Sequence, residues 1–439
     1  MPNCAENKES WLHEQRTLIM MTQNAGLHRL WTEGKETILQ EEGLSEESIL
    51  DGITSGRMIL LGNSGHQGVR PMLIGQPASI KVNANIGTSP FLNDPDLEVN
   101  KAVTAYKAGA HTVMDLSTGG DLDSIRSRIL EATPLPLGTV PLYSVAQEYI
   151  AQGQDPSHIS PEEMLQEIEK QAEQGVDFMT LHCGVTREAA SMARSGERRM
   201  GIVSRGGSIL AKWMEVNQAE NPLLQDFDQI LDICLSRNVT ISLGDGLRPG
   251  AGMDAGDRAQ WEEVIVLAGL NKRARQAGVQ VMIEGPGHVP LHLVKSQIEG
   301  MKRLCDGAPL YVLGPLTTDI APGYDHIAGA IGGAVAGMAG VDFLCYLTPA
   351  EHLTLPNEHD VWQGVKASLV AAHSAEVGLG RTRAVDRNNA ISQARKDLDW
   401  EKITAESLDP DMVRRRRETF ASKEECAMCG DFCAVKLLR

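Results

Sequence analysis

The sequence predicts an α/β protein built on a closed (β/α)8 barrel of the TIM type. From about residue 80 one unit recurs along the chain: a short β-rich run that ends in small or polar residues, then an amphipathic stretch of helical length. Alternating strands and helices predict a parallel sheet, and eight or more such units over about 270 residues favour a closed barrel over an open sheet. Nine runs qualify, so one must lie outside the barrel, and the sequence does not single it out. They are IKVNANIG, TVMDLSTGG, LGTVPLY, DFMTLHCG, GIVSRGG, VTISLGDG, VQVMIEGPG, LYVLGP and DFLCYLTP.

The remaining segments predict smaller parts on either side of the barrel. Residues 1–75 contain helical patterns (SWLHEQRTLIMMTQ and EESILDGITSG) and an irregular GNSGHQG stretch, which together predict an N-terminal cap domain. We expect the barrel catalytic domain over 76–375, a polar helical segment over 376–420, and a flexible cluster-binding tail over 421–439.

Charge and hydropathy exclude several classes of partner. The 439 residues carry a formal net charge of -17, which argues against nucleic acid, because phosphate backbones are bound through dense basic surfaces. The basic run at 414–417 is the local exception, and we expect it to be a solvated helix face. The N-terminus lacks a secretory signal, and the longest charge-free apolar stretch, 327–341, is too short to span a membrane and suits a buried helix. These features predict a cytoplasmic protein.

Five of the eight cysteines are scattered through apparent core or strand segments. Such scatter is typical of reduced thiols and not of a disulfide framework. The five are Cys4, Cys183, Cys234, Cys305 and Cys345.

Polar side chains recur where the predicted strands end. In a (β/α)8 barrel these ends converge on one mouth, where function is found. Any one of these residues is more often an ordinary loop residue, but their recurrence in almost every unit points to a site. They are Asn83, Asn85, Asp115, Tyr143, His182, Ser204, Arg205, Asp245, Arg248, Glu284, His288, Tyr311, Glu351 and His352.

Two strand-end segments suit an anionic ligand. SRGGS (204–208) pairs Arg205 with glycines that let backbone N–H groups approach closely, and GDGLRPG (244–250) places Asp245 and Arg248 around a turn. Phosphate binding is one interpretation of each segment, and turn glycines beside surface arginines are the other.

Two histidines suit a divalent metal such as Zn²⁺ or Fe²⁺. His288 follows Glu284 around a Gly-Pro-Gly turn, and His352 stands next to Glu351 at the end of another strand. Neutral imidazoles from neighbouring strand ends can hold a metal whose shell is completed by carboxylate, water or substrate. Hydrogen-bonded loop histidines are the alternative.

The last cysteines form a compact ligand set. Cys426, Cys429 and Cys433 have the spacing C-x2-C-x3-C, which supplies three thiolates to one small site. Three soft ligands suit a [4Fe–4S] cluster with one open iron, or zinc completed by a distant histidine. An open iron is what radical chemistry with S-adenosylmethionine requires. Structural zinc and an incidental exposed tail remain alternatives on spacing alone.

Taken together, the motifs closely resemble the phosphomethylpyrimidine synthase family of radical S-adenosylmethionine enzymes. The likeness runs from about residue 80 to the C-terminus and rests on long, unusual motifs. These are KVNANIGTS, VMDLSTGGDLD, GTVPLY, IVSRGGS, SLGDGLRPG, EGPGHVPL, LGPLTTDIAPGYDHI, FLCYLTPAEHL and CAMCGDFC.

The resemblance implies a barrel that binds 5-aminoimidazole ribonucleotide, with a mobile C-terminal arm that carries a [4Fe–4S] cluster to an active site, commonly that of the partner subunit in a homodimer. His288 and His352 match the family's metal-binding histidines, and Cys426, Cys429 and Cys433 match the cluster ligands. Substrate contacts carried onto matching positions are Asn85, Met114, Tyr143, His182, Ser204, Arg205, Gly206, Asp245, Gly246, Leu247, Arg248, Glu284 and Tyr311.

The N-terminal side departs from the family pattern. Long-chain members have one more residue between the last two cysteines and a large N-terminal extension. The segment GNSGHQGVRPMLIGQPASIK keeps Asn63 and His66, but Gln76, Pro77 and Ala78 replace a basic element of the thiamine branch. This difference favours the paralogous branch, whose product from the same ribonucleotide is 5-hydroxybenzimidazole, the lower-ligand base of a cobamide (vitamin B12). The alternative product is the pyrimidine phosphate of thiamine biosynthesis.

The resulting hypothesis is a radical carbon–carbon lyase. The cluster, reduced by a one-electron donor, cleaves S-adenosylmethionine, and the radical then abstracts hydrogen from the ribonucleotide. We expect Glu284, His182 and Tyr143 to be catalytic, by orienting the imidazole and ribose or by moving protons. Arg205 and Arg248 are expected to anchor anionic groups. A non-catalytic nucleotide-binding barrel with a structural zinc tail is the rival from another class.

Overall fold

The computed structural model describes residues 23–437, and none of the helices in that range is long and apolar enough to cross a membrane. The chain divides into two compact units, residues 1–372 and 373–439. Cys4 lies outside the described residues, and so does the predicted helix over 10–23 except for its last residue. The other four scattered cysteines are buried free thiols, as expected.

Eight parallel strands close into a barrel in the order β10-β3-β4-β5-β6-β7-β8-β9, which confirms the predicted fold class. Closure is made by β10, whose Cys345 is in register with Asn83 of β3 on one side and Leu313 of β9 on the other. The strands are β3 (Lys81–Ile86), β4 (Thr112–Asp115), β5 (Leu137–Thr139), β6 (Phe178–Leu181), β7 (Thr240–Leu243), β8 (Val281–Gly285), β9 (Leu310–Leu313) and β10 (Phe343–Cys345).

The ninth candidate run, residues 201–207, is the one outside the barrel. It enters helix α9 (Arg205–Asn217), and Ser204 is the N-cap residue, whose side chain accepts a hydrogen bond from the backbone N–H of Gly207. A serine that caps a helix explains why the apolar start of this run does not continue as a strand.

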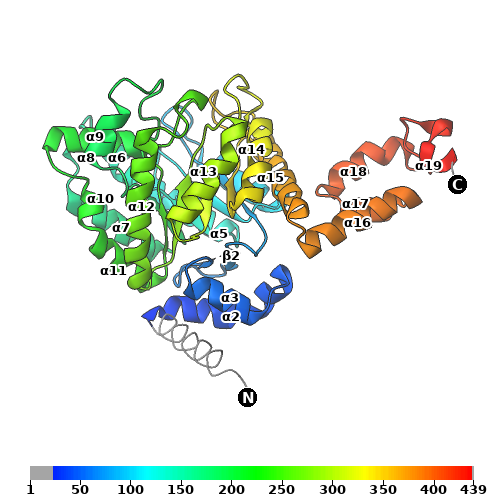
Figure 1. Cartoon of the computed structure of the whole chain (residues 1–439), viewed down its shortest axis with the longest axis horizontal. Helices are drawn as coiled ribbons and strands as arrows, with labels where there is room; N and C mark the ends of the chain where they lie inside the picture. The colour runs from blue at the N-terminus through cyan, green and yellow to red at the C-terminus, as the bar shows by residue number, and fades with distance from the viewer. Residues whose placement is uncertain (1–22, 438–439) are drawn as a thin grey trace, which may run out of the picture. The chain divides into compact units, whose positions relative to one another are not determined.

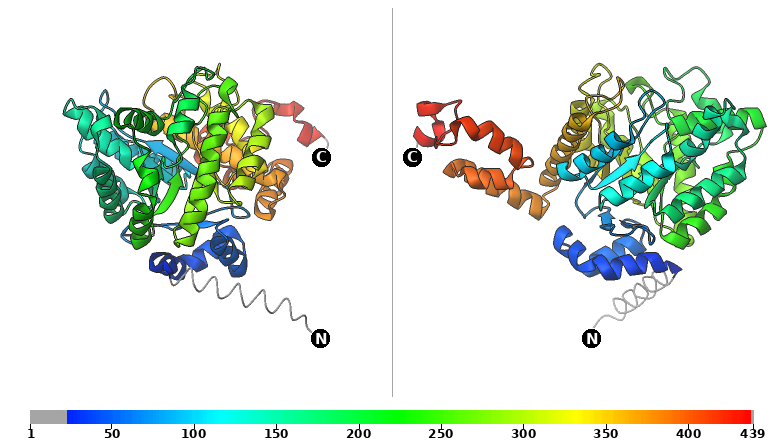
Figure 2. Two further views of the ribbon diagram at one scale, coloured as in Figure 1. Left: turned by 60° about the vertical axis from the view of Figure 1, so that its left-hand side comes forward. Right: turned by 180° about the vertical axis from the view of Figure 1, so that it is seen from behind.

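Helices surround the barrel strands, as Figures 1 and 2 show. Two helices or more follow β5 and β6, while most other strands are followed by one. In chain order they are α4 (Pro95–Ala108), α5 (Leu122–Ala132), α6 (Pro141–Ala151), α7 (Pro161–Gln174), α8 (Arg187–Ala193), α9, α10 (Pro222–Gln225), α11 (Phe227–Arg237), α12 (Arg258–Gln276), α13 (Leu291–Leu304), α14 (Asp325–Ala339) and α15 (Glu358–Gly378), with short 3-10 turns at Pro156–His158 and Gly252–Asp254.

Aromatic side chains fill the barrel interior near the amino ends of the strands. Phe343 stacks on Tyr311 with ring centroids 4.3 Å apart and meets Phe178 edge-on at 6.3 Å. Gly138 makes room for them, because a Cβ at this position would lie 2.2 Å from the Phe178 ring. The barrel interior is therefore packed with side chains near the amino ends of its strands, and its pocket lies near their carboxyl ends.

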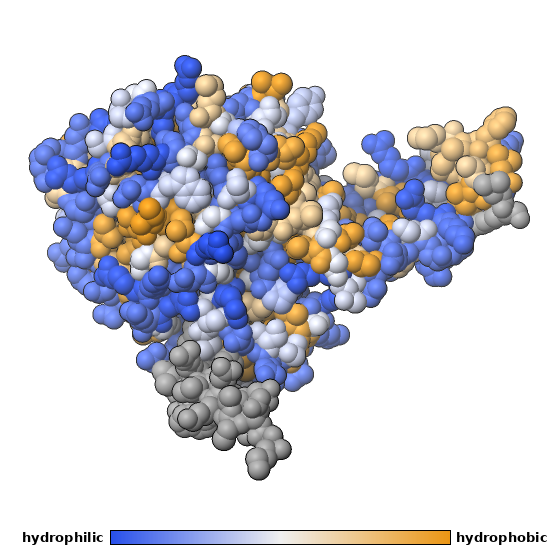
Figure 3. Space-filling view, viewed as in Figure 1, coloured by the Kyte–Doolittle hydropathy of each residue, from blue (hydrophilic) through white to orange (hydrophobic). Residues whose placement is uncertain are grey.

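Helix α14 differs from the expectation for the apolar stretch 327–341. One face packs closely on the barrel, and a Cβ at Gly332 would meet the Pro315 carbonyl oxygen at 1.9 Å. The other face is exposed: Ile327, Ile331 and Met338 are 48%, 48% and 54% accessible. Figure 3 shows apolar side chains gathered over this helix. The sequence is apolar on both faces, so it did not reveal that only one is buried.

The N-terminal residues form a small core of their own. Helices α2 (Ala25–Glu42) and α3 (Glu46–Thr54) pack on a two-stranded antiparallel sheet, β1 (Ile59–Leu61) and β2 (Met72–Ile74). This core is wholly apolar and includes Leu27, Trp31, Ile49 and Leu60.

Two buried aspartates attach this N-terminal region to the amino ends of the barrel strands. Asp177, just before β6, accepts hydrogen bonds from the backbone N–H groups of Asn63 and Leu137 (both 2.7 Å) and pairs with His66 at 2.8 Å. Asp342, just before β10, likewise accepts from the backbone N–H of Gln76 at 2.7 Å. The irregular segment around Asn63, His66 and Gln76 is therefore an attachment at the end of the barrel opposite the strands' carboxyl ends.

We expect Asp177→Asn to destabilise the fold strongly. The amide would present N–H donors to backbone donors and would leave His66 without its partner, and breaking a buried pair in this way costs about 3–5 kcal/mol. Denaturant unfolding should report the loss. Asp228→Asn is the matched control, because Asp228 is 84% exposed and its ion pair with Arg273 contributes little. Equal stabilities of the two variants would contradict the proposed attachment.

The second unit begins within α15, at His373, and contains the polar helices expected after the barrel. They are α16 (Thr382–Asp397), α17 (Trp400–Glu406) and α18 (Pro410–Arg417), followed by 3-10 turns at Glu418–Phe420 and Gly430–Phe432 and by α19 (Ala434–Leu437). The basic run is the last turn of α18. Arg414, Arg415 and Arg416 are exposed as expected, but Arg417 is half-buried and makes specific contacts.

Candidate active site

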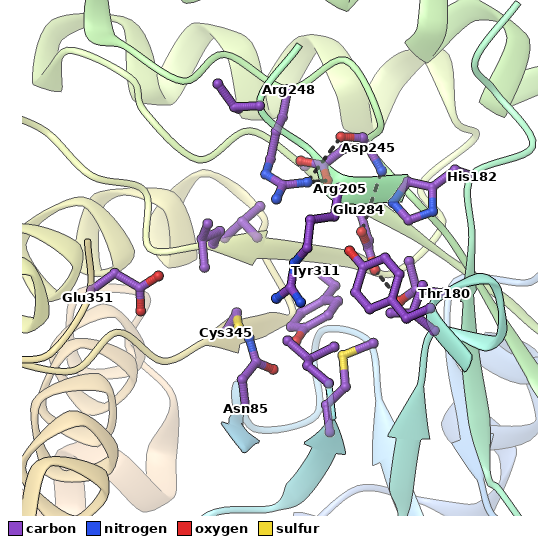
Figure 4. A pocket seen from close by; sticks show the side chains of 18 residues that line it. Asn85, Thr180, His182, Arg205, Asp245, Arg248, Glu284, Tyr311, Cys345 and Glu351 are labelled. Atoms are coloured by element: carbon purple, nitrogen blue, oxygen red, sulfur yellow. Dashed lines mark hydrogen bonds and ion pairs between the residues drawn. The ribbon is translucent and has the colours of Figure 1, made fainter. Parts of the chain in front are cut away.

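A polar pocket of about 190 Å³ opens at the carboxyl ends of the barrel strands (Figure 4). Nine of the thirteen predicted substrate-binding residues line it. The lining comprises Asn85, Met114, Leu116, Val140, Tyr143, Thr180, His182, Val203, Arg205, Asp245, Arg248, Glu284, Gly285, Tyr311, Val312, Leu313, Cys345 and Glu351.

The other four predicted residues, Ser204, Gly206, Gly246 and Leu247, stand behind the lining. Gly206 lets helix α9 begin directly against His182, because a Cβ there would lie 2.3 Å from the imidazole. Gly207 and Gly246 touch through their backbones, so the two glycine-rich turns predicted separately form one packed wall.

An amide and phenol network joins β3, β9 and β10 on one side of the pocket. The Asn83 side chain donates to Asn85 (2.7 Å) and to the Tyr311 oxygen (2.8 Å), and Asn85 donates to the Cys345 sulfur (3.0 Å). Burial raises the pKa of Cys345 to about 12, so this side chain is a neutral thiol. The network fixes the Asn85 side chain at the pocket wall.

His182 is a neutral imidazole with one nitrogen available to a ligand. Burial, with Arg248 nearby, lowers its pKa to about 3. Nε2 lies 3.2 Å from the Ser204 hydroxyl, whereas Nδ1 is buried without a hydrogen-bond partner among residues 23–437. A buried polar atom without a partner at a pocket wall marks a position where bound substrate can supply the missing hydrogen bond.

Arg205 and Tyr143 lie together at the N-terminus of α9. The guanidinium carbon is 4.8 Å from the centre of the Tyr143 ring. Burial raises the pKa of Tyr143, so its phenol keeps its proton. A cation at the start of a 13-residue helix, where backbone N–H groups point outward, makes this wall suited to an anion.

Two carboxyl groups, Asp245 and Glu284, face one another beside Arg248. Glu284 accepts hydrogen bonds from Thr180 (2.6 Å) and Ser242 (2.9 Å), and Asp245 pairs with the guanidinium at 3.1 Å. Burial raises the pKa of Asp245 well above its usual value, and Glu284 adds to this effect against the opposing charge of Arg248. The pair therefore combines a carboxyl group that holds its proton more readily than usual with a hydrogen-bond acceptor, which suits proton transfer.

Behind this pair stands Glu263 of α12, which the motifs did not indicate. Its carboxylate accepts a hydrogen bond from the backbone N–H of Leu247 at 2.8 Å and lies against Gly246. Burial raises the pKa of Glu263 to about 8, although the N–H groups of Leu247 and Gly246 oppose the shift. Glu263 thus holds the backbone of the turn that carries Asp245 and Arg248.

We expect the stability of the chain to fall between about pH 4.5 and 8 in part because of Glu263. In that interval the folded chain holds a proton that the unfolded chain, with the usual pKa of 4.5, has released. This contribution is complete below pH 4.5 and is lost as the pH rises through 8. Glu263→Gln, which mimics the protonated form, should flatten the decline in melting temperature, whereas Glu262→Gln, at a partly exposed position of the same helix, should leave it as in the wild type. Identical slopes in all three would contradict this assignment.

The two predicted metal-binding histidines face each other. The rings of His288 and His352 are 5.4 Å apart between centroids. Nδ1 of His288 lies 2.8 Å from Asp319, and Nδ1 of His352 lies 3.0 Å from Asp325. Each carboxylate orients one imidazole through Nδ1, which leaves Nε2 for a ligand, the arrangement usual around metal-binding histidines.

Asp319 and Asp325 belong to the TTDIAPGYDHI motif but were not predicted as site residues. Asp319 stands on the loop between β9 and α14, and Asp325 is the first residue of α14. Each accepts a hydrogen bond from a backbone N–H: Gly252 donates to Asp319 (2.8 Å) and Gly323 to Asp325 (3.1 Å). The possible signal was the pair of acidic residues in the segment that follows β9. Their partners could not be read from the sequence, because they lie 31 and 27 residues away.

The tail gathers its three thiols in a chain of tight turns. The Gly430 N–H donates to the Cys426 carbonyl, Phe432 to Cys429, and Cys433 to Gly430. N–H groups of Cys429 and Met428 lower the pKa of Cys426, and the neighbouring Cys426 charge raises that of Cys429.

Within residues 23–437 no three His, Cys, Asp or Glu side chains converge as they would on one metal ion. In a [4Fe–4S] cluster each thiolate binds its own iron, and three adjacent thiols fit that requirement.

Of the lining residues that were not predicted as substrate contacts, three have polar side chains: Thr180, Cys345 and Glu351. Thr180 stands two residues before His182, so strand periodicity places both on the inner face. Cys345 was expected only as a structural thiol. Glu351 lies apart from the other labelled side chains (Figure 4), and burial raises its pKa.

The comparisons with known proteins agree with the motifs. A model described as the Radical SAM ThiC family matches residues 22–439. The chain belongs to this family. Phosphomethylpyrimidine synthase of Dehalococcoides mccartyi (strain CBDB1) is 51% identical over 92% of this chain and 94% of its own. Proteins of the same name from Methanopyrus kandleri (49%; 92% and 94%) and Syntrophus aciditrophicus (48%; 92% and 96%) are similarly related.

Membership in a radical SAM family confirms part of the predicted chemistry. Radical SAM enzymes use a [4Fe–4S] cluster and S-adenosylmethionine, and the three clustered thiols are suitable ligands. All three relatives carry the name of the alternative product, the thiamine pyrimidine. None is named for 5-hydroxybenzimidazole, the product that the N-terminal segment favoured.

Proposed function

We propose that this ThiC-family chain converts 5-aminoimidazole ribonucleotide into 4-amino-5-hydroxymethyl-2-methylpyrimidine phosphate, a step of thiamine biosynthesis, as a radical S-adenosylmethionine lyase. The proposal is carried by the strand-end pocket, in which a cationic wall, a carboxyl pair and a neutral imidazole meet.

The choice of pyrimidine over benzimidazole is supported by the place of the divergent segment. Asn63, His66 and Gln76 contact Asp177 and Asp342 at the amino ends of the strands, away from the pocket. Differences there affect how the N-terminal region is attached and do not touch substrate. The names of relatives about half identical to this chain therefore carry more weight for the product.

Arg205 and Arg248 are proposed to bind the substrate phosphate. Both guanidinium groups line the pocket, and Arg205 stands at the N-terminus of α9. Helix N–H groups and guanidinium forks are the usual ligands of phosphate oxygens. Charge and dipole would thus hold the anionic end of the ribonucleotide in one place.

The imidazole and ribose then face groups that can exchange protons. Asp245, whose pKa is raised, can exchange a proton, Glu284 can accept a hydrogen bond, and Nδ1 of neutral His182 lacks a protein partner within the described chain. The Tyr143 phenol keeps its proton and can donate a further hydrogen bond. These groups would orient the substrate and move protons during its rearrangement.

Cys426, Cys429 and Cys433 are proposed to hold the cluster, with a one-electron reductant as partner. When bound, the cluster supplies the electron that cleaves S-adenosylmethionine and so starts the radical reaction. The barrel residues exclude water and side reactions from the substrate.

His288 and His352 are proposed to bind a divalent metal, Zn²⁺ or Fe²⁺, with Asp319 and Asp325 orienting them. Replacing both histidines with Ala should release this metal while iron and sulfide of the cluster stay. Asp319→Asn with Asp325→Asn should weaken metal affinity about 10- to 100-fold, because partners of ligating histidines have effects of this size. Exposed His292→Ala is the control, and elemental analysis after dialysis is the measurement. Unchanged metal content in the histidine variant would refute the site.

A homodimer is part of the proposal. The exposed stripe of Ile327, Ile331 and Met338 on α14 supports it, because apolar side chains spaced along one helix face suit burial against a second copy. Light scattering should give twice the chain mass of 47.6 kDa.

Anaerobic turnover tests the proposed function directly. Reconstituted protein with the ribonucleotide, S-adenosylmethionine and dithionite should yield the pyrimidine phosphate by mass analysis. Formation of 5-hydroxybenzimidazole would contradict the proposed product and show that the chain belongs to the benzimidazole-forming branch. The rival, a nucleotide-binding barrel with a zinc tail, requires stoichiometric zinc, no iron and no 5′-deoxyadenosine.

A further inference from the structure

The chain entering the cysteine tail is held by two side chains from neighbouring helices. Trp400 is the first residue of α17 and Arg417 the last of α18. The Arg417 guanidinium stacks on the Trp400 ring, 3.8 Å from its centre. A cation over an indole at this distance gives the pair a mutual attraction in addition to its hydrogen bonds.

Three consecutive carbonyl groups are bound by this pair. Arg417 donates to the carbonyls of Lys423 (2.6 Å) and Glu425 (3.0 Å), and Trp400 Nε1 donates to that of Glu424 (2.7 Å). Because the next residue is Cys426, these bonds determine where the cysteine tail begins.

The far end of the tail returns to the same place. Lys436, three residues after Cys433, forms ion pairs with Glu425 (2.9 Å) and Glu424 (3.3 Å). The turns of residues 426–433 lie between the two attachments, and Gly430, at φ 49°, takes the left-handed conformation that one of those turns requires. Both ends of the tail are therefore attached at one place. Trp400 and Arg417 bind the residues before Cys426, and Lys436 near the far end pairs with Glu424 and Glu425, whose carbonyls the same two side chains bind.

We propose that Trp400 and Arg417 form a clamp that preorganises Cys426, Cys429 and Cys433 for the cluster. The basic run, expected to be a solvated face, contributes one positioning residue and three exposed ones. A loop that is already folded loses less entropy when it binds a ligand, and the clamp should therefore slow cluster loss. This inference rests on the proposed cluster site and not on the product of the reaction.

The test compares Arg417→Gln and Trp400→Phe with Arg416→Gln in the full-length chain. Arg416 lies in the same run and is exposed, so its variant removes one charge without touching the loop. In the metal-free protein, amide hydrogen exchange over residues 424–433 should accelerate in the two clamp variants and stay at the wild-type rate in Arg416→Gln. This measurement does not depend on the cluster.

After anaerobic reconstitution, iron release to a chelator should be about 10-fold faster in the clamp variants, the size usual for partners of metal ligands. The electron paramagnetic resonance spectrum of the reduced cluster should also change, which a general loosening of the helices would not produce. Arg417→Lys, which keeps the charge without the forked donors, should behave as Arg417→Gln. Wild-type exchange, iron release and spectrum in Arg417→Gln would overturn the clamp alone. Wild-type protein that holds no iron and sulfide, or Cys429→Ala that retains them fully, would overturn the proposed cluster site as well.

Discussion

Cys429→Ala should abolish formation of 5′-deoxyadenosine while leaving the barrel folded. The variant removes one of three thiolates from a cluster site that has no spare cysteine in the described tail, so radical generation should fall to background. Cys429 is exposed and contributes no burial to the barrel core. Substitutions of this kind change stability by about 0.5 kcal/mol or less, which corresponds to a shift of about 2 °C or less in the melting temperature.

The matched control for this prediction is Ser422→Ala, an exposed substitution in the same tail. It should keep wild-type iron, sulfide and 5′-deoxyadenosine. Chromatographic assay of 5′-deoxyadenosine, iron analysis and a thermal melt are measured on the same preparations. A large loss of thermal stability in Cys429→Ala would mean that the tail supports the fold, and continued radical formation would exclude Cys429 as a ligand.

Glu284→Gln should lower turnover at least about 100-fold, the contribution usual for a group that moves protons. The wild-type carboxylate accepts hydrogen bonds from Thr180 and Ser242 and faces Asp245. The amide has one acceptor oxygen and no negative charge, so it can neither take a proton nor share one with Asp245. Cluster content and melting temperature should remain those of the wild type, because the substitution conserves shape.

Exposed Glu299→Gln, 55% accessible, is the control for this second prediction. Steady-state consumption of the ribonucleotide gives kcat and KM for both variants. An activity of Glu284→Gln within about threefold of the wild type would show that Glu284 is not catalytic. Its role would then be to accept the structural hydrogen bonds from Thr180 and Ser242.

Strand periodicity and strand-end polarity were enough to predict the barrel and most of its pocket. Eight of nine candidate runs became strands, because short apolar runs between amphipathic helices have few other ways to be buried. The ninth failed at Ser204, where a capping hydroxyl begins α9. Asn85, His182 and Glu284 meet in the pocket because each follows or ends a parallel strand of one closed barrel.

By itself the sequence determined the fold class, the polar mouth and the cysteine spacing, since these depend on order and period along the chain. Only the tertiary structure decided which residues support the site. Glu263 holds the Leu247 backbone, Asp319 and Asp325 orient the two histidines, and Arg417 is the single arginine of its run that binds the loop before Cys426. The same holds for the divergent N-terminal segment, which the sequence linked to the product and the structure places against Asp177. Hydrogen bonds act over about 3 Å, so their partners are set by barrel closure and loop geometry, which bring together residues far apart in the chain.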